Sequence, residues 1–231
     1  MANPTAPLQK RSVETLGRIV SATEELLRTK SFEEITIREI VGKAGCPIAS
    51  FYARFKSRDD LLPHLYESYN KRINPSMLSK IEKLSAENVD LGGAVESCVD
   101  LIIESYTRDR WLMREVALFA RRNPQAIGSD ARRERSGMHT RAAELFATYK
   151  KQIRHKNPVR AAEVGIFIVA SVARESILFG AAPHAAATGL TQAALRHSLI
   201  HTLHSFLTQP CASPHLCCSS SLRRSPGSPK A

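Results

Sequence analysis

The sequence lacks any apolar run that approaches the roughly 20 residues needed to cross a bilayer. Its first residues, MANPTAPLQK, contain no apolar stretch of the kind that marks a secretory leader. Glycine is scarce, and no glycine-rich phosphate loop is present. The content of 43% hydrophobic and 24% charged residues is that of a globular protein with a real core. We therefore expect a cytoplasmic protein rather than a membrane or exported one.

The sequence also shows no sign of a disulfide framework or of β-strands. The five cysteines are odd in number and irregular in spacing, and we expect free thiols at Cys46, Cys98, Cys211, Cys217 and Cys218. No segment shows a convincing strand alternation, and no repeat is visible. A Ser-His-Asp order and a Cys-His metal cluster are both missing, so we expect no cofactor, no metal and no enzyme. An all-α enzyme stays open as an alternative.

Helical periodicity dominates what is present. Apolar residues recur at steps of three and four from Val13 to Leu27, and similar patterns continue to Gln209. The pattern predicts an all-α protein, with a break or bend at Asn74-Pro75 and later helices at 76–85, 92–107, 110–122, 130–155, 158–180 and 190–208. We expect a helix-turn-helix domain at 10–56, a helical domain at 57–209, and a disordered Ser/Pro/Cys-rich tail at 210–231.

Two short helices joined by a glycine turn are predicted between residues 36 and 55. Thr36 and Glu39 have the spacing of a capping box, which starts a helix. Gly45 ends that helix, and Pro47 suits the first turn of the next one. This arrangement is typical of a helix-turn-helix, whose second helix enters the major groove of DNA.

Positive charge supports a polyanionic partner for this motif. The chain carries a formal charge of +11, and residues 38–58 hold five basic side chains against the single acid Glu39. We expect Phe51 and Phe55 to be core residues and the Tyr52 hydroxyl to reach a phosphate. The expected DNA-contacting residues are Thr36, Arg38, Lys43, Ile48, Ala49, Ser50, Tyr52, Arg54, Lys56 and Arg58.

A resemblance to a known family covers about residues 10–72. It includes the stretch ITIREIVGKAGCPIASFYARFKSRDDLLPHLYE. This stretch resembles the N-terminal DNA-binding domain of the TetR family of bacterial transcriptional regulators. The resemblance implies an all-helical homodimer with a small DNA-binding domain and a larger helical domain that binds an effector. Cys46-Pro47 after the turn and Pro63 early in the fourth helix depart from the family pattern.

The family layout implies an effector pocket among helices 92–155 and a dimer interface on the last two helices. Candidate effector-binding residues, each of which is also a good core residue, are Trp111, Met113, Arg114, Phe119, Phe146, Tyr149 and Phe167. Basic runs at 120–124 and 131–135 fit either an anionic effector or a solvated face. Candidate interface residues are Ile168, Leu195, Leu199, Leu203 and Phe206.

One further pattern concerns metals. His197, His201 and His204 fall on one helical face at a spacing that could share Zn²⁺, but no acid or cysteine accompanies them, and we favour a solvated face. The function expected from all these features is a homodimeric repressor, bound to a palindromic double-stranded operator and released by a small-molecule effector. A ligand-independent architectural DNA-binding protein stays open as a second alternative.

Overall fold

The computed structural model describes residues 5–87, 89–123 and 129–209 as helices and their connections, with no strand in these ranges. The all-α expectation is confirmed. The expected tail at 210–231, with Cys211, Cys217 and Cys218, lies outside the described residues. Cys46 and Cys98 are free thiols, as expected.

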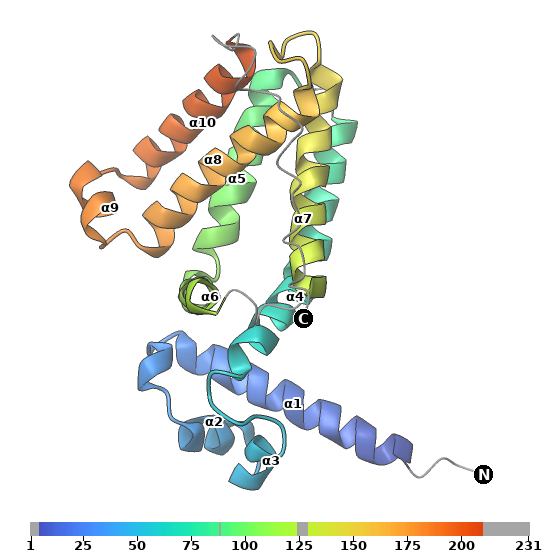
Figure 1. Ribbon diagram of the computed structural model, residues 1–231, viewed down its shortest axis with the longest axis vertical. Coiled ribbons are helices and arrows are strands. Elements are labelled where there is room, and N and C mark those ends of the chain that lie inside the picture. Colours follow the sequence, from blue (N-terminus) through green and yellow to red (C-terminus); the bar gives the residue numbers. More distant parts are fainter. Residues whose placement is uncertain (1–4, 88, 124–128, 210–231) are drawn as a thin grey trace, which may run out of the picture.

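The N-terminal end of the molecule is formed by α1 (Thr5–Leu27), the 3-10 helix η1 (Phe32–Glu34), α2 (Ile37–Ala44) and α3 (Ile48–Tyr52) (Figure 1). Their apolar faces meet in a small core that includes the fully buried Ile19, Ile40 and Phe51. A helix of five residues is not stable by itself, because forming its first turn costs more than it returns. Burial of Phe51 and Phe55 therefore holds α3 in place.

Helix α4 (Leu61–Ala86) leaves this end and runs into the rest of the molecule (Figure 1). Pro63 lies in its first turn, where a missing N–H costs no hydrogen bond. Pro75 lies inside the helix, yet α4 continues through it. The separate helix expected at 76–85 is therefore wrong, because the chain does not break at Asn74-Pro75. Ile73 and Ile81 are buried on either side of the proline, and this packing opposes the cost of the lost hydrogen bond.

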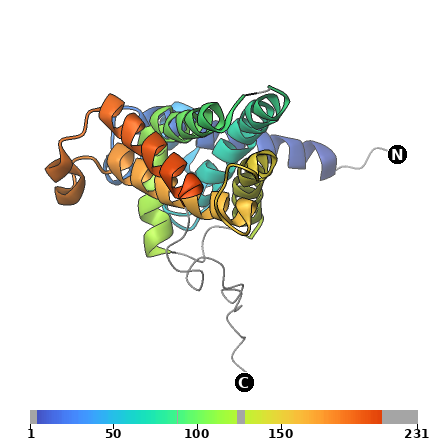
Figure 2. The same ribbon diagram turned by 90° about the horizontal axis from the view of Figure 1, so that it is seen from above.

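Seven further elements build the larger C-terminal part. They are α5 (Leu91–Thr107), α6 (Arg110–Arg122), α7 (Ser129–Glu144), η2 (Leu145–Tyr149), α8 (Pro158–Leu178), α9 (Pro183–Thr188) and α10 (Gln192–Thr208). Helix α8 packs against α5, α7 and α10 (Figures 1 and 2). The helix expected at 130–155 ends earlier, because the chain turns at Glu144 and brings Leu145 and Phe146 into the core.

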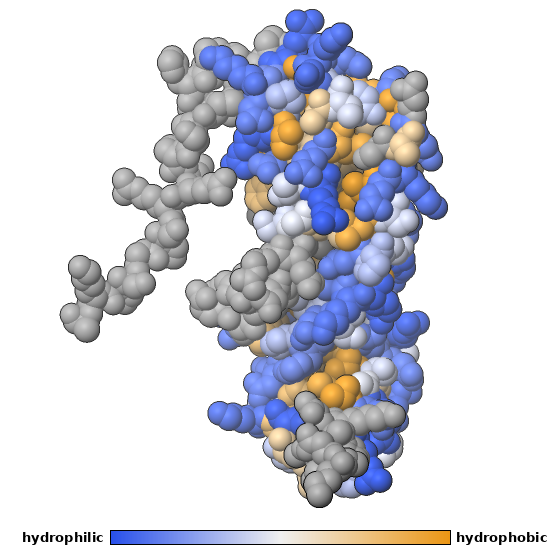
Figure 3. Space-filling model, turned by 90° about the vertical axis from the view of Figure 1, so that its right-hand side faces the viewer, coloured by the Kyte–Doolittle hydropathy of each residue, from blue (hydrophilic) through white to orange (hydrophobic). Residues whose placement is uncertain are grey.

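The surface of the molecule is mostly polar on the face drawn in Figure 3, where apolar side chains form separate patches among hydrophilic ones. Within the described ranges, no helix has the length and apolarity needed to cross a membrane.

Candidate nucleic-acid interface and effector cavity

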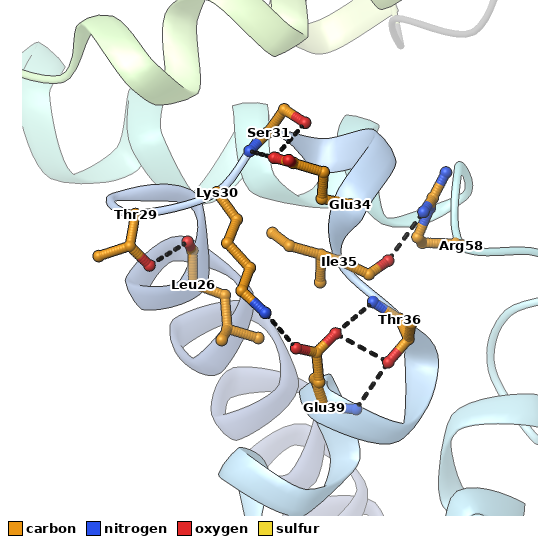
Figure 4. A network of polar contacts seen from close by, with 9 residues as sticks. All are labelled: Leu26, Thr29, Lys30, Ser31, Glu34, Ile35, Thr36, Glu39 and Arg58. Carbon is orange, nitrogen blue, oxygen red and sulfur yellow. Dashed lines mark hydrogen bonds and ion pairs between the residues drawn. The ribbon is translucent and has the colours of Figure 1, made fainter.

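The start of α2 is fixed by a reciprocal capping box. The Thr36 hydroxyl accepts a hydrogen bond from the Glu39 N–H at 3.2 Å, and Glu39 accepts from the Thr36 N–H and hydroxyl, both at 2.8 Å (Figure 4). Lys30 forms an ion pair with the same carboxylate. The hydrogen bond from Lys30, followed by those from Thr36, lowers the pKa of Glu39 to about 2. The Thr36 hydroxyl is therefore already engaged in positioning α2.

The turn between α2 and α3 depends on Gly45, whose φ of 62° lies in the left-handed region. The Cys46 N–H donates to the carbonyl of Val41, and Arg18 from α1 donates to the carbonyl of Gly45 at 3.1 Å. These bonds satisfy carbonyls at the end of α2 and tie the turn to α1. The contribution of Arg18 was missed from the sequence, because nothing in its local pattern indicates a partner 27 residues away.

Helix α3 has one buried and one exposed side. Phe51 and Phe55 are buried, with rings 5.0 Å apart, as expected. Tyr52 is 56% exposed and Ile48 is 43% exposed, while Ala49 is also exposed and Ser50 is half-buried. The exposed side of α3 therefore presents the phenol of Tyr52 together with short apolar and hydroxyl side chains. Such a surface suits contact with the wall of a DNA groove and with the phosphates that border it.

Arg54 is engaged inside the domain rather than directed outward. Its guanidinium donates to the Ser50 carbonyl at 2.6 Å and to the Ser12 hydroxyl of α1 at 3.1 Å. These bonds join the C-terminal end of α3 to α1. Arg54 is therefore an internal link between helices, and its contact with DNA stays a prediction.

Arg58 is engaged in the same manner at the other edge of the domain. It donates to the carbonyls of Glu33 and Ile35 at 3.0 and 2.7 Å, and its guanidinium lies 4.7 Å from the centre of the Phe32 ring. Figure 4 shows it reaching the Ile35 carbonyl beside the capping box. Arg58 therefore fixes the position of η1, and these hydrogen bonds compete with a contact between Arg58 and a DNA phosphate.

The remaining basic residues of the motif differ in availability. Lys43 pairs with Glu25 of α1 at 2.7 Å. Arg38 and Lys56 are exposed, and among the described residues their side chains have no hydrogen-bond or ion-pair partner. The exposed groups of the candidate nucleic-acid interface are therefore Arg38, Ile48, Ala49, Tyr52 and Lys56.

A cavity of about 100 Å³, here called the inner cavity, lies between α4, α5, α7 and α8. Its walls are mainly apolar and include Met77, Ile81, Ile102, Leu145 and Ile166. Polar groups come from Asn74, Ser105, Tyr106 and His139. The buried Cys98 also lines it, and burial raises the pKa of this thiol to about 12, so that it stays protonated and unreactive at neutral pH.

A second cavity of about 380 Å³, here called the outer cavity, adjoins the inner one. Its lining residues are Tyr106, Ser136, His139, Phe167, Ala170, Ser171 and Arg174. Of the expected effector residues, Phe167 lines this cavity. The other six, Trp111, Met113, Arg114, Phe119, Phe146 and Tyr149, line neither cavity.

These six residues have other surroundings in the fold. Met113 and Phe146 are buried in the core, and Arg114 pairs with Glu115 at 3.0 Å. The Trp111 ring lies 5.3 Å from the guanidinium of Arg28, Tyr149 donates to the Val89 carbonyl at 2.9 Å, and Phe119 packs partly buried against the core. The residues that line the cavities are less conspicuous in sequence, because Ala, Ile and Met at helical spacing look like ordinary core.

Helix α4 links the inner cavity to the N-terminal domain. Tyr69 lines the cavity and donates from its hydroxyl to the Ser105 carbonyl at 3.0 Å. One turn later on α4, Arg72 lies 6.0 Å from the Tyr69 ring and forms a 2.7 Å ion pair with Glu24 of α1. Asp109, at the start of α6, lies 4.0 Å from the same guanidinium.

The apolar stripe expected at a dimer interface is inside the subunit. Leu195, Leu199 and Leu203 of α10 are buried, and Phe206 is half-buried in the α8–α10 contact beside Gly165. Within the single chain these four residues contribute to internal packing, and their place at a dimer interface stays a prediction.

Helix α8 instead exposes apolar side chains, with Phe167 at 63%, Val172 at 44% and the expected Ile168 at 37%.

His197, His201 and His204 are exposed, as expected for a solvated face. Among the described residues, no group of three or more His, Cys, Asp or Glu is placed to hold a metal.

The fold and the exposed face of α3 define a helix-turn-helix protein with a helical C-terminal part. A family model described as "Bacterial regulatory proteins, tetR family" matches residues 19–65. The chain is 28% identical over 133 residues to an uncharacterised helix-turn-helix-type transcriptional regulator of Haemophilus influenzae, covering 57% of this chain and 62% of that protein. It is 27% identical over 94 residues to YwcC of Bacillus subtilis, which bears the same description, covering 40% of this chain and 42% of YwcC.

Solved structures show the same fold over most of the chain. A putative TetR-family regulator from Mesorhizobium loti matches with a TM-score of 0.60 at 21% identity, covering 85% of this chain and 96% of that one. The regulator FadR of Bacillus subtilis, solved in complex with stearoyl-CoA, matches with a TM-score of 0.52 at 14% identity, covering 83% and 97%. The family-model match covers the helix-turn-helix segment, so residues 19–65 are similar to the DNA-binding domain of the TetR family of bacterial regulatory proteins. It spans less than two thirds of the length of the curated relatives described above.

Proposed function

We propose that the protein is a DNA-binding transcriptional regulator that acts as a homodimer and leaves its operator when a small molecule binds. The observation that carries this proposal is the exposed side of α3, where Tyr52 and Ile48 are presented while Phe51 is buried beneath them. Arg38 and Lys56 flank this side with exposed charges that have no partner among the described residues. Such a surface combines a groove-facing helix with phosphate-binding cations.

Dimer formation would use the outward face of α8. Ile168 and Val172 lie one turn apart on this helix and are both exposed, which fits contact with the same face of a second copy. A two-fold dimer would present two α3 helices to successive major grooves, about 34–36 Å apart, and would favour a palindromic operator. The buried leucines of α10 would support this face from behind.

Ligand release would act through α4, which contributes both to the inner cavity and to the ion pair with α1. A ligand that fits one arrangement of α4 better than another would shift the separation of the two α3 helices. The bound stearoyl-CoA in FadR supports the idea that this fold can hold a ligand. The cavities also favour a ligand-responsive regulator over a purely architectural DNA-binding protein. The regulator names of the relatives favour it over an enzyme.

The direct test is selection of binding fragments from a random double-stranded DNA pool, followed by mobility-shift titration. We expect an enriched palindromic sequence and a dimer by light scattering, with and without DNA. In Lys56→Ala, affinity should fall and the dependence of log affinity on log salt should lose about one unit of slope, as for a lost phosphate contact. In Tyr52→Ala, affinity should fall by a factor that corresponds to about 1 kcal/mol.

Lys150→Ala serves as the matched control, since Lys150 is exposed in the C-terminal part, away from α3. Its affinity and salt slope should equal those of the unaltered protein. Equal operator affinity for Tyr52→Ala, Lys56→Ala and the control would refute the proposed DNA-contacting surface. A monomer that binds a single half-site with full affinity would refute the dimer.

A further inference from the structure

The two cavities differ in chemistry although they share a wall. Tyr106, His139 and Ala170 line both, so the inner and outer cavities adjoin at these residues. None of the described residues that line the inner cavity carries a formal charge except His139 in its protonated form. The outer cavity contains Ser136, Ser171 and Arg174. An apolar chamber thus continues into one whose walls add two hydroxyls and a cation.

Arg174 has no ion-pair partner among the described residues. Its Nε is buried without a hydrogen-bond partner. The acidic residues of its own helix are both engaged elsewhere, since Glu163 pairs with Arg160 at 2.8 Å and Glu175 pairs with Arg121 at 3.2 Å. A buried N–H donor without an acceptor is costly, and an incoming acceptor would remove that cost.

His139 adds a second polar group at the junction of the cavities. Its Nε2 lies 2.9 Å from the Glu163 carbonyl, and because a carbonyl only accepts, this nitrogen carries the proton. The ring is thereby held in place by α8 while it borders both cavities.

The position of the charge decides the class of ligand. A charged group in the inner cavity would face mainly apolar walls without a counter-ion on the described walls, which is unfavourable. An anionic group in the outer cavity would meet the guanidinium of Arg174 and the hydroxyls of Ser136 and Ser171. An apolar chain in the inner cavity would contact Met77, Ile81 and Ile102, and methionine walls adapt to chains of varied shape.

We propose that the cavities bind an amphipathic anion, with its apolar chain in the inner cavity and its anionic head on Arg174 in the outer cavity. This inference rests on the proposed function, because it assigns the chemical class of the effector. The inner cavity, at about 100 Å³, has room for the end of a short chain. An apolar cavity of roughly 150 Å³ holds benzene in another protein.

The first experiment measures ligand binding without DNA, by isothermal titration of the full chain with three probes that share an eight-carbon chain. We expect octanoate to bind at least about tenfold more tightly than 1-octanol or octylammonium, as for a charge-assisted hydrogen bond. Hexanoate should bind more weakly than octanoate, since fewer methylene groups enter the inner cavity. Equal binding of the three octyl probes, or no octanoate binding, would overturn the proposal.

Variants then locate the head group. In Arg174→Gln, octanoate affinity should fall to that of 1-octanol, and in Arg174→Glu the preference should change to octylammonium. Arg160→Gln is the matched control, because it removes a cation from the same helix outside both cavities, and it should bind octanoate like the unaltered protein. Equal loss in Arg160→Gln and Arg174→Gln would contradict the assignment, since the effect would then follow net charge alone.

A final titration separates this inference from the proposed function. Octanoate is added to the complex with a selected DNA fragment, and release of the DNA is measured for the unaltered protein and for Arg174→Gln. Release from the former alone supports both the ligand class and its role as effector. Octanoate binding at Arg174 without DNA release would leave the binding site standing and refute the effector role. Failure to select any DNA fragment would instead refute the proposed regulator.

Discussion

At the residue scale, the basic side chains of the helix-turn-helix segment divide into internal links and exposed charges. Arg54 and Lys56 are two positions apart and look equivalent in the sequence. Arg54 joins α3 to Ser12 of α1, whereas the Lys56 side chain extends from the surface without a partner among the described residues. A guanidinium has a fixed fork of donors that can satisfy two acceptors at once, which suits the linking role.

This difference predicts separate effects on stability. Arg54→Ala should lower the free energy of unfolding by about 1–2 kcal/mol, because the Ser50 carbonyl and the Ser12 hydroxyl lose their donor. Arg54→Lys should recover little, since an ammonium lacks the fork. Lys56→Ala should leave unfolding in urea within about 0.5 kcal/mol of the unaltered protein. Equal stability of Arg54→Ala and Lys56→Ala would contradict the internal link.

At the element scale, α2 is specified by a few local interactions at its two ends. Thr36 and Glu39 close its N-terminus, and Gly45 ends it in a left-handed conformation. Lys30 from the preceding segment adds an ion pair to the capping carboxylate. Because these interactions are short-range, they fix the direction in which α3 leaves the turn.

The capping box should give α2 a dependence on acid. The folded-state pKa of Glu39 is lowered from its ordinary 4.5 to about 2. Its contribution to stability is therefore complete above about pH 4.5 and is lost as the pH falls toward 2. In thermal unfolding, Glu39→Gln should be less stable than the unaltered protein at pH 6, and the difference should shrink toward pH 2. The exposed Glu82→Gln is the control, and a pH-independent difference for Glu39→Gln would contradict the role of this carboxylate.

Local interactions also explain which parts were predictable from the sequence. The capping box, the Gly45 turn and the opposite orientations of Phe51 and Tyr52 depend on residues a few positions apart, and the structure agrees with all three. The partners of Arg54 and Arg18 are 42 and 27 residues away, so no local pattern indicates them.

The same reasoning applies to the C-terminal part. A leucine stripe at residues 195, 199 and 203 looks alike whether it faces the subunit's own core or a second copy, and only tertiary packing shows that it faces the core. The cavity walls combine residues of α4, α5, α7 and α8, which no single segment reveals. The helix through Pro75 was missed because burial around it opposed the local preference of proline.

At the scale of the whole molecule, an ion pair joins the helix-turn-helix end to the C-terminal part. Arg72 of α4 bonds to Glu24 of α1, which is only 8% exposed, and lies near Asp109 at the start of α6. The hydrogen bond that Arg72 donates to Glu24 raises the pKa of Arg72 and keeps its charge fixed. The link therefore connects three helices, one of which carries the helix-turn-helix.

Loss of the Arg72–Glu24 ion pair should lower the stability of the protein. Arg72→Met should lower the free energy of unfolding by about 1–3 kcal/mol, because the Glu24 carboxylate stays buried without its cation. Adding Glu24→Gln should recover part of the loss, and a double-mutant cycle in urea measures the coupling. Arg160→Met breaks an exposed pair on α8 and should cost no more than about 1 kcal/mol. Additive effects of Arg72→Met and Glu24→Gln would contradict the coupling.

Tyr69 has a consequence for any attempt to redesign this protein as a biosensor. Its ring borders the inner cavity and lies beside Arg72, while its hydroxyl holds the Ser105 carbonyl of α5. Under the proposed function, a library that varies Tyr69 would alter ligand preference and signal output together, and the two could not be tuned separately. Positions 136, 171 and 174 lie in the outer cavity, away from α4. Recognition of new ligands is best evolved at those positions, with Tyr69 kept unchanged so that the output stays the same.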